Sequence, residues 1–99
     1  MIEKILRDEF QLQEQQVRQV LTLIDAGNTI PFIARYRKEQ TGNMDDQTLR
    51  RVADRLEQLR DLGARRAEVT RLIGEQGLMN PLLAAALAGA TTRAELDDL

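Results

Sequence analysis

The chain has 99 residues, of which 42% are hydrophobic and 30% charged, so its length fits one domain or a piece of one. Its formal net charge of −2 argues against a generic polyanion-binding protein. Because the chain contains no Cys, His or Ser, we exclude structural disulfides, Cys/His zinc sites and Ser-His or Cys-His nucleophile pairs.

The first two helices are predicted from apolar residues that recur at helical spacing. The first set is Ile2, Ile5, Leu6 and Phe10, and the second is Val17, Val20, Leu21 and Ile24. Gly27 follows the second set, and glycine at such a position commonly ends a helix. We therefore expect two short amphipathic helices before residue 27.

Residues 28–42 combine aromatic and basic side chains. Phe32 and Tyr36 are four residues apart, which places them on one face of a helix, and with Ile33 we expect them to belong to the core. The basic residues of this segment are Arg35, Arg37 and Lys38. Its ends are predicted at Thr29, as the N-cap, and at Gly42. The segment is therefore predicted to form one short helix with an aromatic side and a basic side.

A long helix is predicted over residues 46–76, with Asp45 as its N-cap and Gly77 after its end. Its apolar seam begins with Leu49, Val52, Leu56 and Leu59. Gly63 costs roughly 1 kcal/mol relative to alanine in a helix interior, which is too little to break a helix of this length. Such a helix would be roughly 46 Å long, so we expect something outside the chain to cover part of it.

Two further helices are predicted in residues 80–99. Asn80 and Pro81 have the character of an N-cap and a first helical residue. Thr92 and Glu95 have the spacing of a capping box, so a last helix begins at residue 93. The predicted fold class is all-α, with five to six helices, one long central helix over about 46–76 and a helix-turn-helix-like N-terminal part. Because the last helix would have only about two turns, we expect the chain to be a fragment of a longer protein.

The position of the charges and apolar residues bears on location and partners. Residues 35–71 carry ten basic and seven acidic groups and form the only net positive third of the chain. No window approaches the roughly 18 apolar residues of a membrane span, and charge appears too early for a signal peptide. We expect a cytoplasmic protein without a membrane partner.

Paired carboxylates are the first candidates for catalytic or metal-binding residues. They are Glu9 with Glu14, Asp45 with Asp46, and Asp97 with Asp98. No basic or nucleophilic partner accompanies them, and Asp45 and Asp46 lie where a helix dipole favours negative charge. We therefore predict no catalytic, cofactor-binding or metal-binding residue and no enzymatic activity.

The basic residues are candidates for a nucleic-acid-binding site. Those that could contact nucleic acid, with phosphates on the cations and a base on the tyrosine ring, are Arg35, Tyr36, Arg37, Lys38, Arg65 and Arg66. Two other interpretations stay open. The cations could form salt bridges with acidic neighbours, such as Arg50 and Arg51 with Asp54 or the 35–38 cluster with Glu39, or they could dock another domain.

Four stretches of the chain resemble the Tex family of bacterial transcription accessory proteins. They are IPFIARYRKEQTG at 30–42, MDDQTLRRVADRLEQLRDL at 44–62, EQGL at 75–78 and AELDDL at 94–99. The resemblance implies an all-helical, helix-turn-helix-containing N-terminal region. It also implies a following RNase H-like domain, helix-hairpin-helix elements and a C-terminal RNA-binding OB-fold domain that is the main nucleic-acid binder. The sequence departs from the family pattern at Gly63, where an ordinary helix former is expected.

We therefore expect residues 1–99 to be the N-terminal helical scaffold of a larger Tex-like protein. Its partners would be other domains of the same chain, nucleic acid bound through the full-length protein and the transcription machinery. Two alternatives remain: a helix-turn-helix module that reads DNA or RNA with the basic helix after Gly27, and a stand-alone adaptor that binds partner helices. Steep salt dependence of binding would favour direct nucleic-acid contact.

Overall fold

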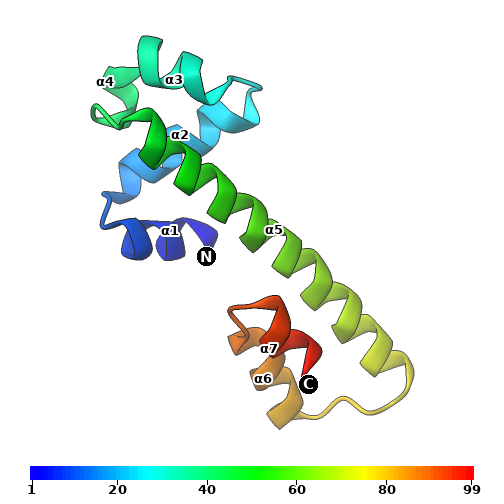
Figure 1. Ribbon diagram of the computed structural model, residues 1–99. Coiled ribbons are helices and arrows are strands. Elements are labelled where there is room, and N and C mark those ends of the chain that lie inside the picture. Colours follow the sequence, from blue (N-terminus) through cyan, green and yellow to red (C-terminus); the bar gives the residue numbers. More distant parts are fainter. The chain divides into compact units, whose positions relative to one another are not determined.

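The structure is a computed structural model that describes residues 1–99. It contains helices and no strand, which confirms the all-α class (Figure 1). The helices are α1 (Ile2–Phe10), α2 (Glu14–Asp25), α3 (Ile30–Tyr36), α4 (Lys38–Thr41), α5 (Asp46–Glu75), α6 (Pro81–Gly89) and α7 (Arg93–Asp97). None of them combines the length and apolarity needed to cross a bilayer.

There are seven helices, one more than the upper end of the predicted five to six. The difference arises in the aromatic-basic segment, which was expected to form one helix. At Arg37 the backbone leaves the helical region, with φ −127° and ψ 30°, so that α3 ends and α4 begins around this residue. The predicted ends of the segment are confirmed. Thr29 Oγ1 accepts the Phe32 N–H at 3.3 Å, and Gly42 has a positive φ of 69°.

The chain divides into two compact units, residues 1–57 and 58–99, and the division falls within α5. In the first unit, α1 contacts α2, α2 contacts α4, and α3 contacts α4. Its fully buried apolar residues, each 0% exposed, are Leu6, Val17, Val20, Ile33, Leu49 and Val52. They come from α1, α2, α3 and the start of α5, so these four elements share one core.

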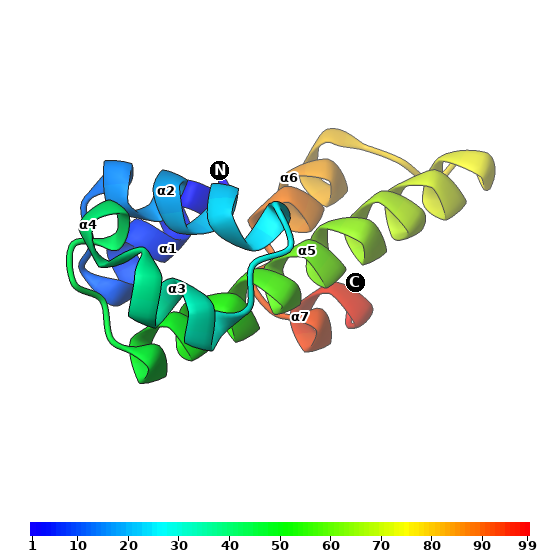
Figure 2. The ribbon, with the colours of Figure 1, turned by 90° about the horizontal axis from the view of Figure 1, so that it is seen from above.

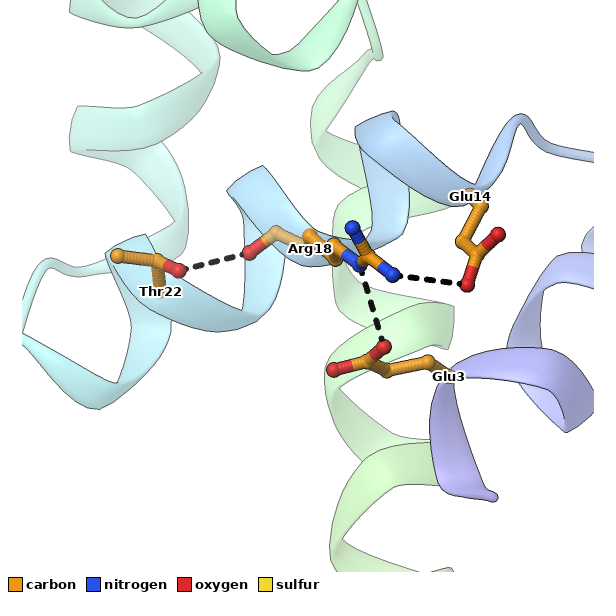
Figure 3. Close-up of polar contacts among 4 residues, drawn as sticks. All are labelled: Glu3, Glu14, Arg18 and Thr22. Atoms are coloured by element: carbon orange, nitrogen blue, oxygen red, sulfur yellow. Dashed lines mark hydrogen bonds and ion pairs between the residues drawn. The ribbon is translucent and has the colours of Figure 1, made fainter.

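Arg18 of α2 connects the first two helices at the surface (Figure 3). Its guanidinium contacts the carboxylates of Glu3 at 3.4 Å and Glu14 at 3.1 Å, and Thr22 Oγ1 donates to the Arg18 carbonyl at 2.8 Å. All three charged side chains are substantially exposed, so this network adds little to stability and mainly fixes side-chain positions.

The long helix α5 confirms the prediction for residues 46–76 to within one residue. Asp45 Oδ1 accepts the Thr48 N–H at 2.7 Å, as expected of an N-cap, and this hydrogen bond lowers the pKa of the Asp45 carboxyl. The stabilising charge on this cap is therefore lost only as the pH falls through that lowered pKa. At the other end, Gly77 has a φ of 71°, and the Leu78 N–H donates to the Ile73 carbonyl at 3.2 Å. These are features of a Schellman motif.

In the second unit, α6 and α7 return beside the later part of α5 (Figure 2). The buried cluster there consists of Leu62, Leu87, Ala90 and Leu96, with Val69, Ile73, Met79 and Leu83 packed against it. The chain itself therefore provides part of the cover that the sequence suggested would come from outside. The predicted caps are present, since Asn80 Oδ1 accepts the Leu83 N–H at 2.8 Å and Thr92 Oγ1 accepts the Glu95 N–H at 3.1 Å.

Gly63 lies inside the uninterrupted α5, and a Cβ atom added there would meet no atom within 4 Å. Gly63→Ala is therefore expected to raise the free energy of unfolding by up to about 1 kcal/mol, because alanine has the better helix propensity and restricts the unfolded chain. Urea unfolding followed by circular dichroism measures this. Gly77→Ala is the matched control and should destabilise the protein, since alanine disfavours its positive φ. A loss of stability in Gly63→Ala would contradict the observed helix.

Candidate nucleic-acid interface

The turn from α3 into α4 presents an aromatic pair that the core only partly covers. Ile33 is 0% exposed and anchors α3, whereas Tyr36 is 56% exposed. Phe32 is intermediate in exposure, and its ring centroid lies 5.1 Å from that of Tyr36, with 48° between the ring planes. The expectation that all three residues belong to the core is therefore correct for Ile33 and wrong for Tyr36. Helical spacing placed the two rings together but did not determine which side of the helix faces solvent.

Two guanidinium groups lie over these rings. The Cζ atom of Arg35 is 5.4 Å from the Tyr36 ring centroid, and that of Arg37 is 5.0 Å from the Phe32 ring centroid. Arg37 Nη1 also donates to the Tyr36 carbonyl at 3.0 Å. Such contacts contribute roughly 0.5–1 kcal/mol each at exposed sites. They orient the guanidinium groups while leaving N–H groups available to an anion.

We call Phe32, Arg35, Tyr36, Arg37 and Lys38 together the α3–α4 surface. No salt bridge joins its three cations to a carboxylate. The predicted pairing with Glu39 is therefore not formed. Residues 35–40 line a shallow hollow of about 470 Å³, in which Glu39 is the only acidic residue. The hollow thus carries three positive charges against one negative charge.

The other two candidates lie in the second unit and are already engaged. Arg65 pairs with Asp97 at 3.2 Å and with Glu68 at 3.3 Å. The hydrogen bond to Asp97, which has the larger effect, and the hydrogen bond to Glu68 raise the pKa of Arg65 above its ordinary value. Arg66 donates to the Leu87 carbonyl at 2.8 Å and to the Ala90 carbonyl at 2.5 Å. These contacts give both guanidinium groups structural roles at α6 and α7.

Along α5, local spacing correctly predicted that Arg65 pairs with Glu68, but it failed nearer the start of the helix. Arg50 and Arg51 form no salt bridge with Asp54. Instead Arg55 makes a bidentate contact with Glu9 of α1, at 2.8 and 3.0 Å, which raises the pKa of Arg55. This partner is 46 residues away in sequence, so spacing along one helix could not have identified it.

A second hollow, of about 500 Å³, lies between the start of α2 and α4. Its lining residues are Gln13, Gln15, Gln16, Gln19, Glu39, Gln40 and Gly42. Gln16 accepts the Gln13 N–H through Oε1 at 3.0 Å and donates through Nε2 to the Thr41 carbonyl at 3.1 Å. This link between α2 and α4 was not predicted from the sequence, where its only signal is the number of glutamines between residues 11 and 19.

Replacing Arg37 and Lys38 together with alanine tests whether the α3–α4 surface is needed for folding. The double variant is expected to change the melting temperature by no more than about 2 °C, because both side chains are exposed and unpaired with carboxylates. Thermal unfolding followed by circular dichroism measures this. A drop of about 8 °C or more would show that these residues stabilise the fold.

The chain is all-helical and has an exposed aromatic-basic turn before its long helix. Its sequence was compared with those of known protein families. Residues 1–74 match the family described as the Tex-like protein N-terminal domain, and the chain belongs to this family.

Individual relatives extend the match over almost the whole chain. It is 45% identical over 96 residues to Protein YhgF of Escherichia coli, covering 97% of this chain and 12% of that protein. It is 44% identical over 98 residues to the transcriptional accessory protein Tex of Neisseria gonorrhoeae, covering 99% of this chain and 13% of that protein. It is 32% identical over 94 residues to the S1 RNA-binding domain-containing protein 1 of Homo sapiens, covering 95% of this chain and 9% of that protein. The chain thus spans about an eighth of the bacterial relatives' length.

Proposed function

We propose that this chain is the N-terminal helical region of a larger Tex-like transcription accessory protein, in which it serves as a scaffold for other domains. The observation that carries the proposal is the 44% identity over 99% of this chain to a transcriptional accessory protein of which it covers only 13%. The helix α5 supplies residues to both compact units, which suits a scaffolding role. The proposed partners are the remaining domains and the transcription machinery, in the cytoplasm.

The proposed function places the main nucleic-acid contact outside this chain. One relative is named for an S1 RNA-binding domain, and the chain matches 9% of it. We assign no catalytic step to these residues. The absence of His, Cys and Ser supports this, as does the use of Asp45 as a helix cap.

A helix-turn-helix module is the second candidate. It is favoured by one observation, the short turn around Gly27 that joins α2 to α3. A reader helix contacts base edges with side chains near its N-terminus. The first three residues of α3 are Ile30, Pro31 and Phe32, which offer no hydrogen-bonding side chain to a base edge. This composition favours the scaffold role over the reader role.

Three proteins test the proposal: the full-length protein, the same protein without residues 1–99, and this chain alone. Binding to duplex DNA and structured RNA would be measured by fluorescence anisotropy at about 0.05 to 0.2 M salt. We expect the shortened protein to keep most of the affinity but to unfold at a lower temperature, and this chain alone to bind duplex DNA weakly or not at all. Loss of all binding on removal of residues 1–99, or tight and salt-sensitive duplex binding by this chain alone, would favour the helix-turn-helix candidate.

A further inference from the structure

The α3–α4 surface has charge that the protein itself does not neutralise. Arg35, Arg37 and Lys38 are exposed and have no carboxylate partner, whereas Arg55 and Arg65 of α5 are each held by a carboxylate from another helix. The charges of Arg55 and Arg65 are thus compensated within the protein, and those of Arg35, Arg37 and Lys38 are not. A group of three cations left unpaired around one hollow is therefore suited to an external anion.

The aromatic pair narrows the kind of anion. Phe32 and Tyr36 form a row of rings that ends in the exposed Tyr36, and one planar guanidinium lies over each ring. A nucleobase can extend such a row by stacking on Tyr36 when the Arg35 guanidinium turns from the ring to a flanking phosphate, while the other phosphates meet Arg37 and Lys38. An acidic peptide would satisfy the charges but would leave the exposed ring without a specific partner.

The geometry favours a single strand over a duplex. In a duplex the bases are paired and stacked on one another, so an aromatic side chain at a protein surface reaches a base face only by unstacking neighbouring base pairs. The residues of α3 that would enter a major groove first are apolar, and the cations gather at the opposite end of the helix. With seven residues, α3 is also only about 10 Å long.

We propose that the α3–α4 surface binds a short stretch of single-stranded nucleic acid, with a base stacked on Tyr36 and the neighbouring phosphates on Arg35, Arg37 and Lys38. The inference deepens the proposed function, on which it rests, by adding a weak contact within this chain to the main contact elsewhere. Such a site would guide an unpaired strand along the larger protein without reading its sequence. Its affinity would be modest, with a dissociation constant on the order of 10–100 µM at moderate salt.

The intrinsic fluorescence of the protein offers a direct test of stacking. The chain has one tyrosine, Tyr36, and no tryptophan, so all of its tyrosine emission comes from the proposed site. Titration with oligo(dT) or oligo(U) of about twelve nucleotides should quench this emission, and a duplex of the same length should not. Equal quenching by duplex and single strand, or binding detected by anisotropy without quenching, would overturn the stacking arrangement.

Variants test the two parts of the surface separately, by anisotropy with the same labelled oligonucleotides. Tyr36→Leu should weaken single-strand binding by about 5- to 100-fold, and Tyr36→Phe should retain it because the ring remains. The triple variant Arg35→Ala, Arg37→Ala and Lys38→Ala should lower the slope of log affinity against log salt by about two. Unchanged affinity in the Leu variant or an unchanged slope in the triple variant would overturn the proposal.

The matched control removes two exposed charges that form no salt bridge, from the same unit, with Arg50→Ala and Arg51→Ala. It should bind within about twofold of the original chain at moderate salt, since these residues do not line the hollow. A loss as large as that of the triple variant would mean that general surface charge, and not this site, attracts the strand. Poly-glutamate that binds as tightly as the oligonucleotides would instead identify an acidic protein segment as the partner and overturn the inference.

Failure of this inference can be told apart from failure of the proposed function. The scaffold role depends on the full-length protein with and without residues 1–99, whereas the single-strand site depends on substitutions at the α3–α4 surface of this chain. Circular dichroism melting curves of every variant would confirm that it is folded. Because Tyr36 is 56% exposed and the three cations form no salt bridge, unfolding is not expected to explain a loss of binding.

Discussion

Replacing Ile33 with alanine is expected to lower the free energy of unfolding of the first unit by about 2–5 kcal/mol. Ile33 is 0% exposed and is the only residue of α3 that is fully buried, so its side chain attaches α3 to the core. The substitution removes buried methylene and methyl groups and leaves a cavity that the surrounding helices can fill only in part. A cost of this size is a large fraction of the total free energy of unfolding of a small domain.

The measurement is urea unfolding followed by the fluorescence of Tyr36, which lies on the same helix and is the chain's only tyrosine. Ile33→Val is the graded control and should cost about 0.5–1.5 kcal/mol, because it removes one methyl group. A cost below about 1 kcal/mol for Ile33→Ala would mean that α3 is held mainly by its cap and by α4. The α3–α4 surface would then be more loosely positioned than its geometry indicates.

The helices of this chain could largely be predicted from sequence because their ends are determined locally. Thr29, Asp45, Asn80 and Thr92 each accept a hydrogen bond from a backbone N–H three residues later. Such a bond depends only on the residue type and on its position before an apolar stripe, so it can be read from sequence. The continuity of α5 through Gly63 could be predicted for a related reason, since one glycine costs little in a helix of 30 residues.

The break at Arg37 could not be predicted in this way. No glycine or proline marks it, and the aromatic and basic residues on both sides are compatible with one helix. Gln16 donates to the Thr41 carbonyl in α4, 25 residues away, and so helps to hold the short helix beside α2. Tertiary context of this kind can override local helix propensity where the sequence contains no stop signal.

The sequence predicted that the rings and cations of the α3–α4 surface lie together, but it did not predict that Tyr36 is exposed. Spacing brought Phe32 and Tyr36 together and placed cations beside them, as the structure shows. Which side of α3 is covered depends on the neighbouring helices, and the sequence of α3 contains both an aliphatic and an aromatic side that could serve as the core. The same limitation applies to Arg65 and Arg66, whose partners in α7 and at the end of α6 are 21 to 32 residues away.

Arg66→Met is expected to have the second largest effect and to lower the free energy of unfolding of the second unit by about 2–3 kcal/mol. The Arg66 guanidinium donates to the Leu87 and Ala90 carbonyls, where α6 ends without a capping backbone hydrogen bond. The last carbonyls of a helix have no partner within it and carry partial negative charge, so a guanidinium satisfies them well. Methionine keeps the apolar stem of the side chain but leaves both carbonyls, which are partly buried, without this donor.

Because the second unit contains no aromatic residue, amide hydrogen exchange of α6 is the appropriate measurement. Arg71→Met is a matched control on the same helix, since Arg71 pairs only with the exposed Glu75 at 2.9 Å and should cost less than about 0.5 kcal/mol. If Arg66→Met accelerates exchange in α6 and Arg71→Met does not, Arg66 is a structural cap and is removed from the set of nucleic-acid contacts. If the two variants show the same exchange rates in α6, water satisfies the carbonyls at the end of α6. Arg66 then remains a candidate for contact with nucleic acid.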